Sequence, residues 1–139
     1  MTLAEKQRRL SDELSAIEDA HERLAAIVAR TRRLKPLTEA ERTEAHRVRG
    51  CVSPVWLVGE LREGQCYFRC DADGPLVKGL VALLCDFFSG ATPVEIVSSD
   101  ADPLAELGLT KNLSPTRRNG LASARAAILS FASAHHPGN

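Results

Sequence analysis

The sequence lacks a long apolar run, an excess of either charge and an apolar leader. No run of apolar residues approaches the roughly 20 that a helix needs to cross a bilayer, so we expect no membrane span. The 18 Lys and Arg balance 18 Asp and Glu, and a neutral chain lacks the basic excess that nucleic-acid-binding proteins use to hold phosphates. Residues 1–20 are charged throughout, which favours a cytoplasmic protein.

The common catalytic motifs are also missing from the sequence. It contains no phosphate-binding P-loop, no G-x-G-x-x-G, no H-E-x-x-H and no G-x-S-x-G. The four histidines are scattered, and no Ser/His/Asp triad is suggested by their positions. The four cysteines are therefore the most distinctive chemistry in the chain.

What is present fits a single domain over residues 1–139. A chain of this length buries roughly two-thirds of the surface that its unfolded form exposes, which is enough for one core. Apolar residues make up 44% and charged residues 26%, a composition typical of a folded globular protein rather than a disordered one.

Helical periodicity dominates the first 45 residues. Apolar residues recur at three- and four-residue steps over residues 4–33, which predicts one amphipathic helix or two in tandem. Pro36 ends this pattern. Thr38 and Glu41 then match a capping box, so we expect a short helix that runs to about Ala45.

The middle of the chain has the period of β-strands. Residues 55–58 are β-branched and aromatic, and residues 66–70 alternate between core-type and polar side chains. Glu63 and Gly64 between them are a turn signal, so the two segments predict an antiparallel hairpin. Residues 47–49 are a candidate third strand.

The second half of the sequence is helical. The run from Val77 to Phe88 is apolar on all sides and predicts a deeply buried helix. Three later helices are expected where a capping residue precedes proline, and the last of them runs to about Ala134: Thr92-Pro93, Asp102-Pro103 and Ser114-Pro115. Helices followed by two or three antiparallel strands and more helices indicate an α+β fold.

The spacing of the cysteines argues against a shared metal site. In a cytoplasmic protein, the thiols of Cys51, Cys66, Cys70 and Cys85 are expected to be mostly reduced. Four residues of strand separate Cys66 from Cys70 by about 13 Å. Two thiolates so far apart do not both reach one ion at about 2.3 Å. We therefore interpret Cys66, Cys70 and Cys85 as buried core residues.

Cys51 differs from the other three because it lies on a predicted loop. It follows Gly50 and precedes Pro54, which keeps the segment out of regular strand pairing. Arg47, Arg49 and His46 lie just upstream, and positive charge favours a thiolate. The position of Cys51, taken by itself, leaves two interpretations open. Cys51 is either a reactive thiol presented to a partner or a packing cysteine.

Four segments, taken together, resemble the SufE family of sulfur acceptors. They read VRGCVSPVWLV at 48–58, DADGPLVKGL at 71–80, GATPVEI at 90–96 and LSPTRRNGL at 113–121, in the order of the family. An L-G-L at 107–109 adds to the match. Two features depart from the family: Val52 and Pro54 stand in place of its usual glutamines, and the N-terminal helix lacks its common aromatic residues.

The resemblance implies a fold and a function. The fold is α+β, with a small three-stranded antiparallel sheet packed against several helices in one SufE-like domain. The function is to take persulfide sulfur from a PLP-dependent cysteine desulfurase of the SufS or CsdA type, to stimulate that enzyme and to deliver the sulfur to an iron–sulfur scaffold complex. The acceptor of the family motif falls on Cys51. The chain itself then needs no metal or bound cofactor, because PLP belongs to the desulfurase, and a weak homodimer stays open.

The resemblance also implies supporting roles for Asp73 and Arg117. Asp73 alternatively caps the buried helix that follows it. Arg117 lies in the first turn of its helix, where a cation is unfavourable for the helix dipole. We therefore consider a pairing of Arg117 with Asp73, stabilisation of the Cys51 sulfur anion, or a simple exposed position.

Two other classes of function compete with the sulfur carrier. The first is a stand-alone thiol-dependent oxidoreductase or transferase, which a C-x-x-C at Cys51 would favour, but the sequence has none. The second is a metal or cluster scaffold that uses all four cysteines, against which the strand spacing argues.

Overall fold

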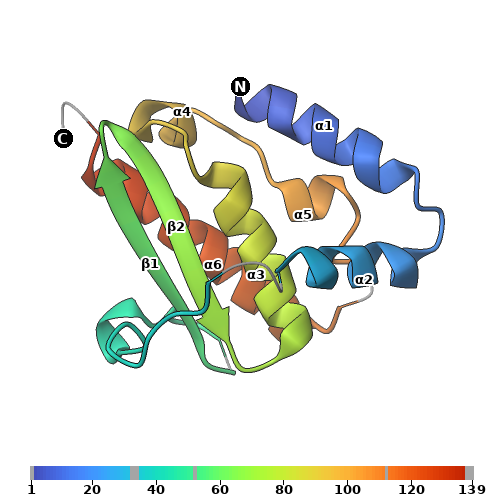
Figure 1. Cartoon of the computed structure of the whole chain (residues 1–139), viewed down its shortest axis with the longest axis horizontal. Helices are drawn as coiled ribbons and strands as arrows, with labels where there is room; N and C mark the ends of the chain where they lie inside the picture. Colours follow the sequence, from blue (N-terminus) through green and yellow to red (C-terminus); the bar gives the residue numbers. More distant parts are fainter. Residues whose placement is uncertain (1, 32–34, 52, 112, 137–139) are drawn as a thin grey trace.

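The computed structural model describes residues 2–31, 35–51, 53–111 and 113–136, which form a β-hairpin packed against a group of helices (Figure 1). The elements follow the α+β order expected from the sequence: α1 Leu3–Ser15, α2 Ala20–Thr31, the 3-10 helix η1 Glu44–His46, β1 Val55–Arg62, β2 Gln65–Ala72, α3 Pro75–Phe88, α4 Pro93–Val97, α5 Pro103–Glu106 and α6 Pro115–Ala134.

The predicted hairpin is confirmed. Strands β1 and β2 pair antiparallel from Val55 opposite Ala72 to Arg62 opposite Gln65. Glu63 and Gly64 connect them with positive φ angles of 51° and 80°. Positive φ at both central residues is the geometry of a tight hairpin turn whose twist matches that of the strands.

The predicted third strand does not form, so the sheet has two strands and not three. Residues 47–49 contribute one antiparallel bridge, Arg47 to Trp56, with the Val48 N–H donating to the Val55 carbonyl at 2.8 Å. The pairing ends there because Gly50 turns the chain with a φ of 90°. Pro54 also has no N–H to extend a ladder.

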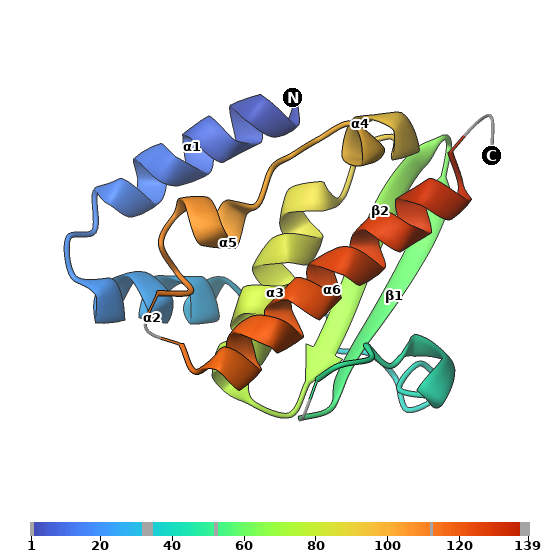
Figure 2. The ribbon, with the colours of Figure 1, turned by 180° about the vertical axis from the view of Figure 1, so that it is seen from behind.

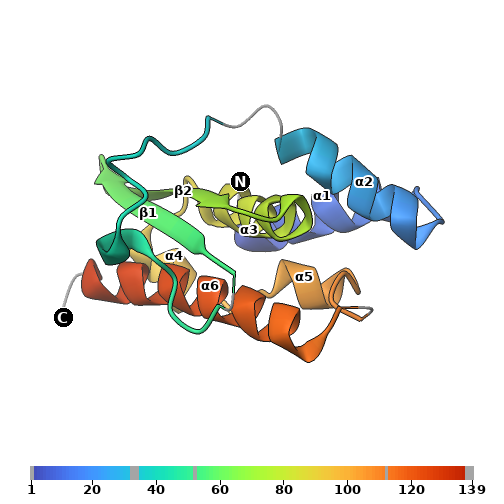
Figure 3. The same cartoon turned by 90° about the horizontal axis from the view of Figure 1, so that it is seen from below.

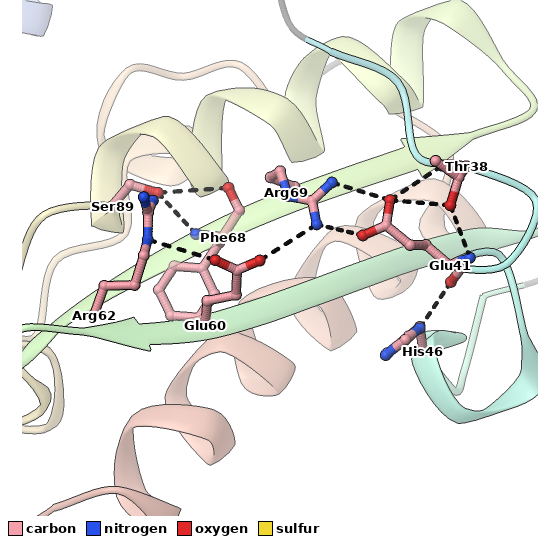
Figure 4. A network of polar contacts seen from close by, with 8 residues as sticks. All are labelled: Thr38, Glu41, His46, Glu60, Arg62, Phe68, Arg69 and Ser89. Carbon is pink, nitrogen blue, oxygen red and sulfur yellow. Dashed lines mark hydrogen bonds and ion pairs between the residues drawn. The ribbon is translucent and has the colours of Figure 1, made fainter.

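The predicted helix from Thr38 to Ala45 is wrong, although its capping box forms. The Glu41 N–H donates to Thr38 Oγ1 at 3.3 Å, and the Thr38 N–H donates to Glu41 Oε1 at 3.1 Å. Thr43 is extended, so only a turn and then η1 follow. Glu41 instead pairs with Arg69 on β2, which anchors the segment to the hairpin (Figure 4).

The N-terminal pattern forms two helices rather than one. Asp19 caps the second of them, since its Oδ1 accepts from the His21 N–H at 2.7 Å. Helix α1 lies across the end of α3, where Lys6 Nζ donates to the Phe87 and Ser89 carbonyls at 3.0 and 2.7 Å. These carbonyls have no partner inside the helix, so Lys6 caps α3 from another element.

Helix α3 is the centre of the core, as its apolar sequence predicts. All residues from Gly79 to Cys85 are buried, together with Phe87 and Phe88. Strand β2 packs along one side of α3 and α2 along another (Figure 1). At Gly79 a Cβ atom would lie 3.1 Å from Val28 Cγ2, so the glycine lets α2 approach closely.

The free edge of β2 is covered by the link between α3 and α4. The Cys66 N–H donates to the Ala91 carbonyl, and the Gly90 N–H donates to the Cys66 carbonyl, both at 2.7 Å. The Phe68 N–H donates to Ser89 Oγ at 2.9 Å. This link therefore satisfies the start of the edge that an isolated hairpin would leave open.

Helix α6 covers the hairpin and α3 from behind (Figure 2). The Phe131 ring meets the Phe68 ring edge to face with centroids 5.5 Å apart. From below, α6 runs along one side of the molecule, and the segment before η1 crosses the opposite side (Figure 3). No helix in the described part of the chain is long and apolar enough to cross a membrane.

The three cap-and-proline signals are all confirmed. Thr92 forms a complete capping box with Glu95 at the start of α4. Asp102 and Ser114 each accept a hydrogen bond from the backbone N–H three residues on. These caps fix where α4, α5 and α6 begin.

Truncation of Ile128 should destabilise the fold. Its side chain is fully buried on α6, so Ile128→Ala should lower the free energy of unfolding by about 2–5 kcal/mol through lost burial and a cavity. Val94→Ala is the matched control, because Val94 is 45% exposed on α4 and should change little. Urea unfolding followed by circular dichroism measures both. Equal losses in the two variants would contradict this placement of α6.

Candidate functional site

Cys51 lies where the chain turns from the Arg47 bridge toward β1. Gly50 makes the turn with a φ of 90°, a region that favours glycine. A Cβ atom at Gly50 would also lie 2.7 Å from Ser123 Oγ on α6. The backbone angle requires glycine here, whereas the Ser123 hydroxyl could move away from a side chain. The turn brings Cys51 against α6. Val52, which replaces a family glutamine, lies outside the described residues.

The Cys51 sulfur is half-buried against a glycine of α6. Its thiol donates a hydrogen bond to the Gly120 carbonyl at 3.4 Å. A Cβ atom on Gly120 would lie 3.3 Å from the sulfur, closer than most side chains tolerate. Gly120 is buried inside a helix, where glycine is an unfavourable residue, and its place is explained by the room that it leaves for the sulfur.

A cavity of about 370 Å³ opens beside Cys51. Its wall combines the cysteine loop, the start of α3 and the start of α6, with these residues: Cys51, Ser53, Val55, Gly74, Pro75, Leu76, Val77, Ser114, Thr116, Arg117 and Gly120. The side formed by α3 is apolar. The side formed by the start of α6 carries the hydroxyls of Ser114 and Thr116 and the cation of Arg117. The cavity therefore has room for a small group bonded to the Cys51 sulfur.

The environment of Cys51 holds its thiol protonated. Burial raises the pKa of Cys51 above its ordinary value, because a thiolate loses solvation there, and the nearby Arg47 cation opposes that shift. The expectation that upstream cations favour the thiolate is thus right for Arg47 but outweighed by burial. Arg49 is exposed, and His46 Nδ1 faces the Glu41 carbonyl at 2.7 Å.

Asp73 is exposed and does not cap α3, contrary to one of the two interpretations of this residue. The N-cap of α3 is Gly74, which has no side-chain cap hydrogen bond. The backbone of Asp73 still lies beside the cysteine loop, since its N–H donates to the Pro54 carbonyl at 3.3 Å. Its side chain is not part of the cavity wall.

Arg117 shares the cavity with Cys51. It is exposed in the first turn of α6, and its N–H donates to the Ser114 hydroxyl at 3.3 Å. Within the described ranges, no hydrogen bond or ion pair joins it to Asp73. The fold therefore brings Arg117 to the Cys51 cavity and leaves Asp73 at its margin.

The sequence analysis did not single out Asp71, a buried carboxylate near the cysteine loop. Asp71 is only 5% exposed, and its carboxylate meets Lys78 of α3 at 3.3 Å and Arg42 at 3.6 Å. It lies opposite Trp56 in the hairpin, so it ties three segments around the cysteine loop. The sequence did contain a signal for this ion pair, because Asp71 and Lys78 both belong to the motif at 71–80.

The other three cysteines are buried, as predicted. Cys66 is fully buried, and Cys70 and Cys85 are 8% and 3% exposed. Cys70 and Cys85 line a cavity other than that of Cys51. Among the residues that the structure describes, no group of three or more His, Cys, Asp or Glu side chains is placed to hold a metal ion.

Two known proteins are similar to this chain in sequence. An uncharacterized SufE-like protein of Synechocystis sp. is 34% identical over 119 residues, which are 86% of this chain and 75% of that protein. The chloroplastic quinolinate synthase of Oryza sativa subsp. japonica is 41% identical over 101 residues. That stretch is 72% of this chain but only 14% of the rice protein.

The fold is also found in a solved structure. The solution structure of a hypothetical protein from Thermus thermophilus matches with a TM-score of 0.75, covering 93% of this chain and 94% of that one at 18% identity. At this identity the match concerns the fold alone. The family model described as SufE, Fe-S metabolism associated domain, matches residues 8–132. With that match over most of its length and the SufE-like relative, this chain belongs to the SufE family.

Proposed function

We propose that this protein is a sulfur carrier that accepts persulfide sulfur on Cys51 from a PLP-dependent cysteine desulfurase, stimulates that enzyme and passes the sulfur to an iron–sulfur scaffold complex. One observation carries the proposal: the cysteine of the family motif is half-buried at a cavity of about 370 Å³. That volume accommodates the additional sulfur atom of a persulfide. Membership of a family associated with Fe-S metabolism supports the proposal that the sulfur goes to an iron–sulfur scaffold complex.

The transfer step conserves atoms and electrons. The Cys51 thiolate attacks the outer sulfur of the donor persulfide, and a new S–S bond forms at Cys51. The S–S bond of the donor breaks, and the donor cysteine leaves as a thiolate that takes up the proton lost by Cys51. The rate depends on the thiolate fraction of the attacker, on the leaving group and on access. The PLP chemistry that makes the donor persulfide belongs to the partner.

The surroundings of Cys51 suit a carrier that reacts only with its partner. Burial and the hydrogen bond to Gly120 favour the thiol, so the free chain is a slow nucleophile toward other compounds. A docked desulfurase that draws Cys51 out of this contact removes both effects. Arg117, on the same cavity, adds a cation near the place where sulfur charge develops.

The oxidoreductase alternative lacks a resolving thiol at the site. Such an enzyme needs a second cysteine that reaches the first, and Cys51 is the sole cysteine on its cavity wall in the described structure. Cys66 is fully buried in β2, and the remaining two cysteines line another cavity. The carrier is therefore the better-supported interpretation.

Loss of the Cys51 thiol should abolish sulfur loading. After incubation with a desulfurase and cysteine, intact mass spectrometry of the wild type should show a gain of one sulfur that a reducing thiol reverses. Cys51→Ser should show none, because a serine hydroxyl does not form a persulfide. Cys66→Ala, which removes a core thiol, should load like the wild type. Undiminished loading of Cys51→Ser would refute the assignment.

Arg117 should assist the transfer to a small extent. Arg117→Ala removes the cation from the cavity, so we expect sulfur transfer to Cys51 about two- to fivefold slower, the range that an exposed charge contributes. Arg118→Ala is the matched control, since Arg118 is an exposed neighbour that does not line the cavity. Single-turnover loading measures both rates. An equal decrease in the two variants would leave Arg117 without a specific role.

Arg47 should set the pH dependence of Cys51. Its cation favours the thiolate, so Arg47→Ala should raise the Cys51 pKa further above its ordinary 9.0 and slow alkylation near pH 8 by about two- to fivefold. The limiting rate at high pH should stay the same, because access is unchanged. Arg49→Ala, an exposed cation next to the same loop, should leave the profile in place. A parallel shift in both variants would mean that only net charge matters.

A further inference from the structure

We propose that Cys70 and Cys85 form a second thiol site, a dithiol that a small hydroperoxide converts into a disulfide linking β2 to α3. The site is separate from Cys51 and does not depend on the proposed sulfur transfer. Its substrate is a compound of the class ROOH, of which hydrogen peroxide is the smallest.

The fold brings these two cysteines together from different elements. Cys70 lies near the end of β2, and Cys85 lies near the end of α3, which packs along that strand. Both are free thiols, and both line one cavity of about 250 Å³. Two thiols that face one cavity from adjoining elements are an arrangement from which a disulfide can form.

Charged side chains of both signs line this cavity. Lys35, Arg62 and Arg69 line it, together with the carboxylate of Asp86. Figure 4 shows the arginines along the hairpin, where Glu60 meets Arg62 at 3.4 Å and Arg69 at 3.5 Å. Because Glu41 and Glu60 pair with the two arginines, the wall offers guanidinium hydrogen-bond donors, rather than a net positive charge, to the oxygen anion that leaves a hydroperoxide.

The two sulfurs have different roles. Hydrogen bonding to Cys70, together with burial, holds the pKa of Cys85 well above its ordinary value, and the Asp86 carboxylate acts in the same direction. Cys70 is also the more exposed of the two, at 8% against 3%, so a hydroperoxide in the cavity reaches Cys70 first. This assigns the nucleophile to Cys70 and the resolving thiol to Cys85.

The oxidation balances in two steps. The Cys70 thiolate attacks one oxygen of the hydroperoxide, an S–O bond forms, the O–O bond breaks, and the second oxygen leaves as alcohol or water with the proton of Cys70. The Cys85 sulfur then displaces the oxygen from the Cys70 sulfenic acid, and water leaves with the proton of Cys85. Two thiols are oxidised to one disulfide, and one hydroperoxide is reduced.

The test uses Cys51→Ser protein, so that its outcome is independent of sulfur loading on Cys51. Treatment with dilute hydrogen peroxide should remove two of the three remaining thiols and lower the intact mass by two hydrogens. Digestion and tandem mass spectrometry should locate the cross-link at Cys70 and Cys85. The cross-link shortens the free chain of the unfolded state, so the thermal midpoint should rise and return after reduction.

Alanine variants in the same background supply the controls. Addition of Cys70→Ala or Cys85→Ala should abolish the mass loss, whereas Cys66→Ala should keep it, because Cys66 is buried on β2 but does not line this cavity. If Cys85→Ala does not fold, the Cys70→Ala variant and the mapped cross-link still test whether Cys70 and Cys85 form the disulfide. Three results would overturn the site: a disulfide to Cys66, over-oxidation of Cys70 without a cross-link, or thiols that stay unchanged where free cysteine is oxidised.

Discussion

The rest of the molecule depends on the need to cover α3 on every side. Its residues from Gly79 to Cys85 are apolar or small all round, and such a helix is stable in water only when other elements remove all its faces from solvent. The hairpin, α2 and α6 each cover one face of α3. Lys6 of α1 caps the C-terminal end of α3 by donating to the Phe87 carbonyl. The two thiol sites lie at opposite ends of this covered helix, since Val77 lines the Cys51 cavity and Cys85 lines the other.

The Cys51 site is made by two glycines that allow close contact between a loop and a helix. Gly50 has the positive φ that its position requires, and it lies close to Ser123 of α6. Gly120 costs the interior of α6 about 1 kcal/mol relative to alanine, and its missing Cβ is what admits the sulfur. The site is therefore positioned by backbone geometry more than by side-chain hydrogen bonds.

Local signals were enough to predict most elements but not the contacts between them. Caps followed by proline placed the starts of α4 to α6, Glu63-Gly64 placed the hairpin turn, and alternation placed Cys66 and Cys70 in the core. The third strand failed because Gly50 turns the chain after one bridge, and the helix after Thr38 failed because Glu41 is anchored to Arg69 on β2. The position of Cys51 came from the family motif. Cys70 and Cys85 face one cavity from a strand and a helix, and no local sequence pattern records that proximity.

Sulfur loading, on the proposed function, changes the contact that holds Cys51 in place. The free thiol donates to the Gly120 carbonyl, and that bond needs a proton on the sulfur. A persulfide has no such proton on its inner sulfur, so the carbonyl then faces lone pairs rather than a donor. The docked position of the loop is weaker in the loaded form for this reason. The cavity of about 370 Å³ has room for the outer sulfur. On the proposed function, the loaded chain therefore shelters this sulfur while a sulfur-accepting partner can draw the loop out more easily.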